Sequence, residues 1–204
     1  MKKIFAFIAA AFMAISASAQ SEAGSFTLQP NVGVTYSTAT GDGSDADGAF
    51  ALTAGVEGMY MVNEKFGAAL GLNFTGHNVS RNAFIGNYNY NVGGYPKNED
   101  VIYSNYYFNI PITANYYVMP GLALKAGIAM NILSTAKIDG EDKVLGENVK
   151  DMYKSTFFSV PVGASYEFND FVCDLRYNFG ISKVSDTEVD GSFNALSFTV
   201  GYKF

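Results

Sequence analysis

The chain has 204 residues, of which 49% are hydrophobic and 15% aromatic, and its formal net charge at pH 7 is −6. This acidic balance argues against nucleic acid as a partner, because nucleic-acid binding needs a basic surface. Cys173 is the single cysteine, so an internal disulfide is excluded.

Residues 1–19 have the pattern of a secretory signal peptide. Two lysines precede an apolar run at residues 4–15, and residues 17–19 match an A-x-A cleavage site. The run is too short for a transmembrane anchor, and the residue directly after the cleavage site is Gln20 and not a cysteine, which argues against a lipoprotein. Cleavage is expected to leave a single domain of 204 − 19 = 185 residues that starts at Gln20.

Eight later segments alternate apolar residues with small or polar ones. Successive strand side chains point to opposite faces, so each segment is predicted to be a strand with one apolar face. The segments are 26–36, 50–62, 66–74, 106–116, 122–132, 158–168, 171–181 and 193–204. Their length and period predict an all-β fold, an eight-stranded antiparallel up-and-down transmembrane β-barrel within residues 20–204.

The connections between these segments differ in length. Three are tight turns, at residues 63–65, 119–121 and 169–170. Four are long and polar, at residues 38–49, 79–104, 135–154 and 183–192. Short turns at one end and long loops at the other are typical of outer-membrane barrels, so both termini are expected on the periplasmic side.

The loop at residues 77–103 is rich in Asn, Tyr and Gly, and it includes Tyr88, Tyr90 and Tyr95. Tyrosines among small polar residues suit an adaptable recognition surface. They equally suit an extension of the two flanking strands above the membrane, so both interpretations stay open.

The charges support a lipid-facing apolar side. Of the 30 charged residues after the signal peptide, 24 fall in loops or turns or near the start of the mature chain, and none falls on an apolar strand face. The other six alternate with the apolar sets: Glu57, Lys125, Glu167, Asp174, Arg176 and Lys203. An eight-stranded barrel is filled by its own side chains, so we expect these six to pair in the lumen and close it rather than line an open pore.

The last strand ends the chain on aromatic residues. Phe198, Val200, Tyr202 and Phe204 follow at two-residue steps, which resembles the C-terminal signal read by barrel-assembly machinery. Aromatic residues also gather near both ends of the strands, as in interfacial girdles, and Phe193 is assigned to the loop-side girdle.

Two strands carry similar motifs around Pro111 and Pro161, in F-x-[IV]-P-[IV]-x-A-x-Y segments at residues 108–116 and 158–166. Both prolines fall on the inward face. Proline cannot donate a ladder hydrogen bond, so each is predicted to mark a bulge or a local break in pairing.

Candidate sites for chemistry are few. His77, the only histidine, could serve as a base, but no G-x-S-x-G, H-E-x-x-H or paired histidine accompanies it, so we expect a solvated residue at the base of a loop and no catalysis. Asp42, Asp45 and Asp47 suggest calcium weakly, because the distal Glu of an EF-hand loop is missing. A solvated acidic loop is the preferred interpretation, and no cofactor is predicted.

With the two proline motifs, residues 174–181 and the ending Gly201-Tyr-Lys-Phe204, the chain resembles the outer membrane protein β-barrel domain family. The resemblance is to PorT-like members, common in Bacteroidetes, with a distant likeness to the small barrels OmpA and OmpX. It covers about residues 24–204. It implies integral residence in a Gram-negative outer membrane, with lipid, lipopolysaccharide and the barrel-assembly machinery as partners, and it says little about activity.

Three functions are compared. The favoured one is a structural or interaction role, in adhesion or envelope integrity, with four acidic loops that contact an extracellular protein or glycan. A small channel or transporter is the second. A soluble periplasmic lipocalin-like binder is the third, and it would place the apolar strand faces inside the barrel.

Overall fold

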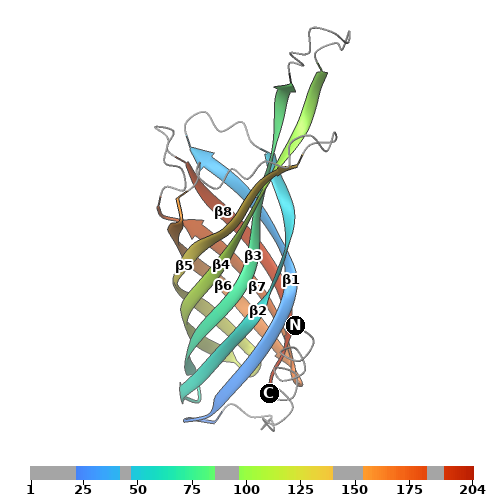
Figure 1. The fold of residues 1–204 in the computed structure, drawn as a ribbon. Helices are drawn as coiled ribbons and strands as arrows, with labels where there is room; N and C mark the ends of the chain where they lie inside the picture. Colours follow the sequence, from blue (N-terminus) through green and yellow to red (C-terminus); the bar gives the residue numbers. More distant parts are fainter. Residues whose placement is uncertain (1–21, 42–46, 86–96, 140–153, 183–190) are drawn as a thin grey trace, which may run out of the picture.

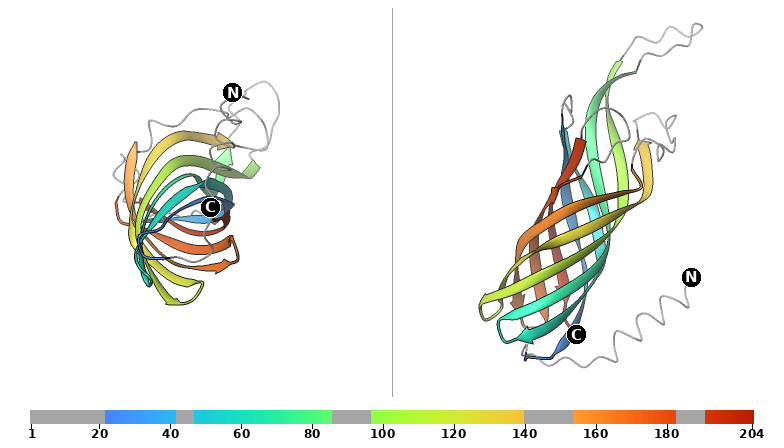
Figure 2. Two further views of the ribbon diagram at one scale, coloured as in Figure 1. Left: turned by 90° about the horizontal axis from the view of Figure 1, so that it is seen from below. Right: turned by 90° about the vertical axis from the view of Figure 1, so that its left-hand side faces the viewer.

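The computed structural model describes residues 22–41, 47–85, 97–139, 154–182 and 191–204. They form eight strands: β1 Phe26–Gly41, β2 Asp47–Asn63, β3 Phe66–Ile85, β4 Lys97–Met119, β5 Leu122–Asp139, β6 Thr156–Phe168, β7 Phe171–Gly180 and β8 Gly191–Tyr202. Each strand pairs antiparallel with its neighbours in sequence, and β1 pairs with β8, so the sheet closes into a barrel (Figure 1). The strands are tilted against the barrel axis (Figure 2). The predicted fold class is confirmed.

The three short connections are tight turns that lie together at one end of the barrel, which we call the turn end. Gly121 and Asn169 adopt positive φ angles of 82° and 53° in two of these turns. Glycine and asparagine tolerate this left-handed conformation better than other residues, which explains their use here. The C-terminus lies at the same end (Figure 1), and the opposite end is called the loop end. Within the described residues, no helix has the length and apolar character needed to cross a bilayer.

Strands β3 and β4 continue well beyond their neighbours at the loop end (Figure 1). They remain paired from Val79↔Tyr103 to Ile85↔Lys97. On the adjoining strand, the pairing of β2 with β3 ends at Asp47↔Ser80. Much of the sequence between residues 79 and 104 therefore extends the hairpin, which was one of the two interpretations of this loop.

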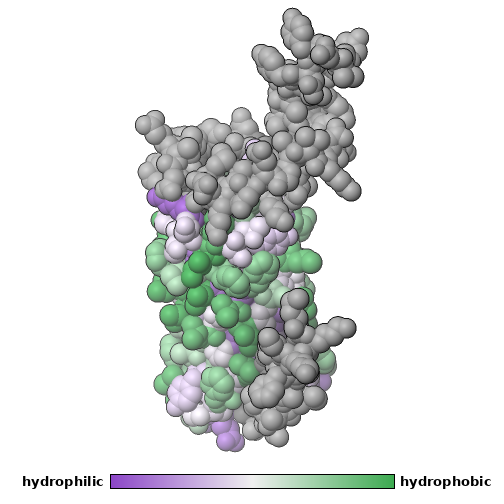
Figure 3. All heavy atoms as spheres, viewed as in Figure 1, coloured by the Kyte–Doolittle hydropathy of each residue, from purple (hydrophilic) through white to green (hydrophobic). Residues whose placement is uncertain are grey.

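The outer face of the barrel is apolar. Large hydrophobic side chains are exposed on every strand, among them Leu52 on β2 at 70% and Ile128 on β5 at 60%. Hydrophobic residues gather around the middle of the barrel in the space-filling view (Figure 3). This arrangement suits a lipid surface and contradicts the soluble binder, which required the apolar faces to point inward.

Aromatic rings pair near both ends of this outer face. Phe171 and Tyr202 lie 5.4 Å apart between ring centroids at the turn end, and Tyr36 and Phe50 lie 4.9 Å apart toward the loop end. The assignment of Phe193 to the girdle is wrong, because its side chain is only 2% exposed and lies inside the barrel. Leu196 and Phe198 point outward on β8, so the alternation of side chains along this strand already assigns Phe193 to the inward face.

Pro111 and Pro161 are fully buried in the lumen, and each interrupts one ladder. The β3–β4 pairs pass from Leu70↔Ile112 to Asn73↔Asn109 without a register shift. The β5–β6 pairs pass in the same way over Pro161. Each proline thus marks a local break in pairing but no bulge, since its ring nitrogen has no hydrogen to donate.

Candidate functional site: the lumen

The six charged residues that were predicted to face inward all lie in the lumen. They come from β2, β5, β6, β7 and the residue after β8: Glu57, Lys125, Glu167, Asp174, Arg176 and Lys203. The side chains are between 4% and 11% exposed. Charged groups at this depth need partners, because burial without pairing is costly.

Four of these residues form one cluster, the charge quartet of Glu57, Lys125, Asp174 and Arg176. Lys125 Nζ lies 2.5 Å from Glu57 Oε1 and 2.7 Å from Asp174 Oδ2. Arg176 Nη2 lies 3.0 Å from Glu57 Oε2 and 2.9 Å from Asp174 Oδ2. Since β2, β5 and β7 are not neighbours in the sheet, the quartet bridges the lumen from wall to wall.

The other two charges form a pair closer to the turn end. The Lys203 ammonium donates to Glu167 Oε2, and the Tyr117 hydroxyl donates to Glu167 Oε1 at 2.5 Å. The Tyr117 ring also belongs to a buried apolar cluster that fills the lumen at the turn end, made up of Met59, Met61, Ala69, Tyr117 and Ala123. The lumen is therefore packed on the turn side of the quartet.

Glycines opposite the quartet provide the space that its long side chains occupy. Glu57 pairs with Gly71 on β3, and Gly163 on β6 lies opposite both Lys125 and Arg176. A Cβ atom at Gly163 would lie 2.3 Å from the carbonyl oxygen of Leu175, which is too close for any side chain. Gly163 thus allows β6 and β7 to approach closely beside the ion pairs.

The formal charges of the quartet cancel, with two carboxylates against one ammonium and one guanidinium. Taking such groups out of water costs several kcal/mol per ion, and ion pairing with good geometry offsets that cost. Removing one member leaves a buried charge without compensation. The quartet therefore acts as a unit whose stability depends on all four side chains.

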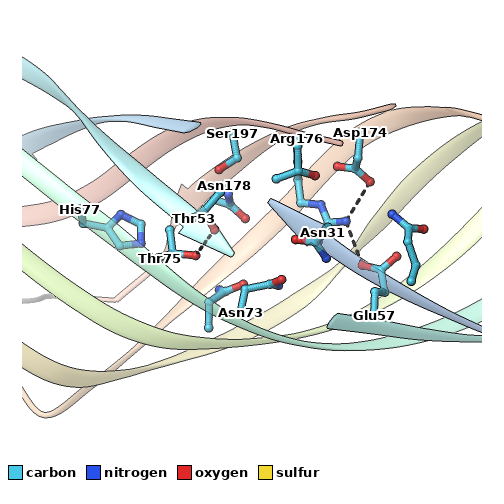
Figure 4. Close-up of a pocket in the computed structure, with 13 residues that line it drawn as sticks. Asn31, Thr53, Glu57, Asn73, Thr75, His77, Asp174, Arg176, Asn178 and Ser197 are labelled. Atoms are coloured by element: carbon cyan, nitrogen blue, oxygen red, sulfur yellow. Dashed lines mark hydrogen bonds and ion pairs between the residues drawn. The ribbon is translucent and has the colours of Figure 1, made fainter. Parts of the chain in front are cut away.

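Hydroxyl and amide side chains line the lumen on the loop side of the quartet. Thr53 and Thr75 share a hydrogen bond at 2.7 Å. Asn109 Nδ2 donates to Asn131 Oδ1 at 2.7 Å, between β4 and β5. Thr53, Thr75 and Asn109, together with Arg176 and other residues, surround a small polar cavity, which we call the polar chamber (Figure 4).

His77 is buried at the loop side of the chamber, with 3% of its surface exposed, so the expectation of a solvated residue at a loop base is wrong. Its ring stacks on Phe193 at 5.6 Å and meets Tyr107 and Phe157 edge-on at 5.4 Å and 5.7 Å between centroids. We call these four residues the aromatic layer. Stacked and edge-on arrangements are the preferred contacts of aromatic rings, and these rings occupy the lumen on this side.

Sequence reasoning placed none of the three aromatic partners of His77 in the lumen: it passed over Tyr107 and Phe157, and it assigned Phe193 to the girdle. Tyr107, Phe157 and Phe193 each occupy an inward position of their strand, next to the outward Phe108, Phe158 and Asn194 respectively. An aromatic residue at a position that alternation assigns to the lumen is the signal that could have found them. Tyr117, the partner of Glu167, could have been found in the same way.

The calcium candidates are only partly within the described residues. Asp42 and Asp45 lie outside them, and Asp47 is exposed at the start of β2. In the part of the chain that the structure describes, no group of three or more His, Cys, Asp or Glu residues is placed to hold a metal ion.

The four residues that were predicted to form a C-terminal assembly signal lie at the seam where the barrel closes, on β8 and just after it. Phe198, Val200 and Tyr202 face outward on β8. Phe204 exchanges two backbone hydrogen bonds with Leu28, at 2.9 Å and 3.1 Å. The last residue thus pairs the end of the chain with β1, beyond the last residue of β8 itself.

A closed eight-stranded barrel with an apolar outer belt and an ion-paired lumen defines a transmembrane β-barrel protein. The model of the outer membrane protein beta-barrel domain matches residues 5–204. The chain belongs to this family, and it is an integral outer-membrane protein.

Solved structures of small barrels share the fold. Neisserial surface protein A is 16% identical with a TM-score of 0.51, and the alignment covers 90% of this chain and 100% of that one. The attachment invasion locus protein of Yersinia pestis is 17% identical with a TM-score of 0.50, and 89% and 99% are covered. The latter has also been solved with the heparin analogue sucrose octasulfate, at 15% identity, a TM-score of 0.50 and 88% and 99% coverage. No curated protein sequence matches the chain.

Proposed function

We propose that this protein is a structural and interaction protein of the outer membrane, whose closed barrel anchors and displays the loop-end elements. The observation that carries the proposal is the charge quartet, which crosses the lumen between β2, β5 and β7. An ion entering the lumen would have to separate buried ion pairs, and this is costly. The barrel is thereby an anchor and not a conduit.

In this proposal the turn end and both termini face the periplasm, as the short turns favour. The apolar belt contacts membrane lipid and, in the outer leaflet, lipopolysaccharide. The terminal Phe198, Val200, Tyr202 and Phe204 are the assembly signal that the barrel-assembly machinery reads. Outward side chains at three of these positions, and the pairing of Phe204 with β1, support this role.

The interaction surface is centred on the extended β3–β4 hairpin, which stays paired up to Ile85↔Lys97 and whose connecting sequence at residues 86–96 is rich in Tyr and Asn. The four loops contain more acidic than basic residues, so they favour a neutral or cationic protein or glycan over a sulfated one. Attachment is the role named for the Yersinia pestis protein that shares this fold. Adhesion or envelope integrity is accordingly the physiological class that we propose.

Catalysis is not part of the proposal. His77 lies within a layer of three aromatic side chains, which leaves little room for a substrate beside its ring. The test is His77→Ala in the purified protein. Any lipid- or peptide-modifying activity that the wild type shows and His77→Ala lacks would contradict the non-enzymatic assignment.

Planar bilayers test the closed lumen. Protein whose folding has been verified by heat-modifiable gel mobility, and which fractionates with the outer membrane, is expected to give no steady single-channel steps. The polar chamber is the observation that favours the alternative, a small channel. Steady ohmic conductance of the wild type would establish that alternative and overturn the closed lumen.

Cell attachment tests the interaction role separately. The variant replaces residues 82–100 with an Asn-Gly turn, which closes the shortened hairpin at Arg81↔Val101. Cells displaying the wild-type chain are expected to bind immobilised cationic proteins or neutral glycans better than cells displaying the variant. Equal binding by both, at equal amounts of folded barrel, would remove the hairpin from the proposal.

A further inference from the structure

The polar chamber lies between two barriers. Arg176, Asp174 and Glu57 line it on the turn side, and His77 lines it on the loop side (Figure 4). Amide and hydroxyl side chains complete the wall, from Gln29, Asn31, Thr53, Asn73, Thr75, Asn109, Asn178, Ser197 and Thr199. The chamber is therefore polar on its sides and is bounded along the barrel axis by the quartet and the aromatic layer.

Two buried polar atoms of the chamber wall have no hydrogen-bond partner among the described residues. They are Nδ1 of His77 and Nε of Arg176. Each belongs to a side chain that lines the chamber. Buried polar atoms in folded proteins are nearly always hydrogen-bonded, to protein or to ordered water, so both atoms point to a ligand within the chamber.

The size and charge of the chamber define the chemical class of that ligand. Its volume is about 30 Å³, which is room for about two water molecules. The quartet is formally neutral, so it gives no net attraction for a free cation or anion. A small neutral molecule that both donates and accepts hydrogen bonds fits these requirements, and water is the smallest such molecule.

The aromatic layer separates this chamber from the loop end. Tyr107, Phe157 and Phe193 are 0%, 1% and 2% exposed, respectively, and belong to one buried apolar cluster with Val79, Leu133 and Ala136. Phe157 and Tyr107 meet edge-on at 5.0 Å between centroids. Buried rings in mutual contact leave little room for water or solutes between them, so the layer forms the barrier on this side.

We propose that the lumen holds an enclosed hydration site, in which bound water completes the hydrogen bonding of Arg176 and His77, and that the aromatic layer seals this site from the loop end. The inference rests on the closed lumen proposed above. The closed lumen and the seal can fail separately. Conductance reports passage through the whole barrel, whereas access of a reagent to the chamber from the loop end reports the state of the aromatic layer alone.

Cysteine labelling tests the seal. Ser197→Cys places a thiol in the chamber wall, in a Cys173→Ala background that removes the native, lipid-facing thiol. The reagent is the small water-soluble thiol reagent 2-aminoethyl methanethiosulfonate, added to protein folded in liposomes. Labelling of the folded barrel is expected to be at least about 100-fold slower than that of the urea-unfolded chain, because access requires a local opening.

Opening the layer should restore access. Phe157→Ala in the same background is expected to speed labelling at least about tenfold, because it leaves a gap in the layer. Phe158→Ala is the matched control, since the neighbouring Phe158 faces lipid and its loss should leave labelling slow. If Phe157→Ala does not fold, as judged by heat-modifiable mobility, Phe193→Ala is used instead. Fast labelling of the parent Ser197→Cys barrel, or equally slow labelling of all folded variants, would overturn the seal.

Nuclear magnetic resonance tests the water itself. In ¹⁵N-labelled protein in micelles, the Arg176 Nε proton is expected to show a cross-peak to long-lived water. Contacts of this proton to protein protons alone, with no water cross-peak, would overturn the hydration site whatever the labelling shows.

Discussion

Lys125→Met removes the ammonium group at the centre of the charge quartet. Lys125 makes the two contacts at 2.5 Å and 2.7 Å to Glu57 and Asp174, so both carboxylates lose a partner at once. Arg176 alone remains, at 3.0 Å and 2.9 Å from the same two groups. The formal charge of the cluster changes from 0 to −1 in a buried site.

The expected cost follows from this geometry. Breaking a buried ion pair by removing one partner costs about 3–5 kcal/mol, because the remaining charge stays buried without compensation. Glu57→Gln in addition to Lys125→Met restores a neutral cluster that retains the Asp174–Arg176 pair. The double variant should therefore be more stable than Lys125→Met alone. Such non-additivity of the two changes in the free energy of unfolding is expected only when Lys125 and Glu57 interact.

Urea unfolding in detergent micelles, followed by heat-modifiable mobility, measures these changes. Lys65→Met is the matched control, because Lys65 is exposed in the β2–β3 turn, and its loss should change the free energy of unfolding by no more than about 0.5 kcal/mol. If Lys125→Met unfolds at the same urea concentration as Lys65→Met, the quartet contributes nothing to stability and the reasoning fails.

Three further outcomes are expected. Gly163→Ala should destabilise the barrel by about 1–3 kcal/mol, because the added Cβ meets the Leu175 carbonyl oxygen at 2.3 Å. Gly58→Ala is the control, because its Cβ meets only side-chain atoms, those of Phe26 and Leu28, and equal urea midpoints would contradict the prediction. Deletion of Phe204 should reduce the fraction of folded protein in the outer membrane, because the two hydrogen bonds to Leu28 are lost. Phe204→Tyr is the control and should assemble normally. Normal insertion of the shortened chain would refute the assembly signal. A chelator should leave the melting temperature of the purified protein unchanged, and a fall that calcium reverses would support metal binding at Asp42, Asp45 and Asp47.

Much of the fold could be predicted from two simple patterns. Alternation identified the eight strands, and connection length identified the turn end, because both are local properties of the chain. The strand bounds at the loop end could not be predicted in this way. The sequence there is polar, and pairing between β3 and β4 continues through it because the hydrogen-bonded hairpin is already in register below.

His77 and Phe193 show where the local argument stops. Alternation assigns both side chains to the inward face. It does not say whether the lumen is packed with other side chains or open to solvent at that height along the barrel axis. The contacts with Tyr107 and Phe157 join β3, β4, β6 and β8, which are distant in the chain and meet only when the barrel closes. A residue that looked solvated at a loop base is therefore buried, with 3% of its surface exposed.

The sequence by itself determined which side of each strand faces lipid, because one charged residue on that side would be costly and none is present. It also determined which six charges face inward. Only the tertiary structure decided that four of them meet in one cluster while Glu167 and Lys203 pair apart. The physical reason is that strand tilt and closure set the height of each inward residue, and these are properties of the whole barrel.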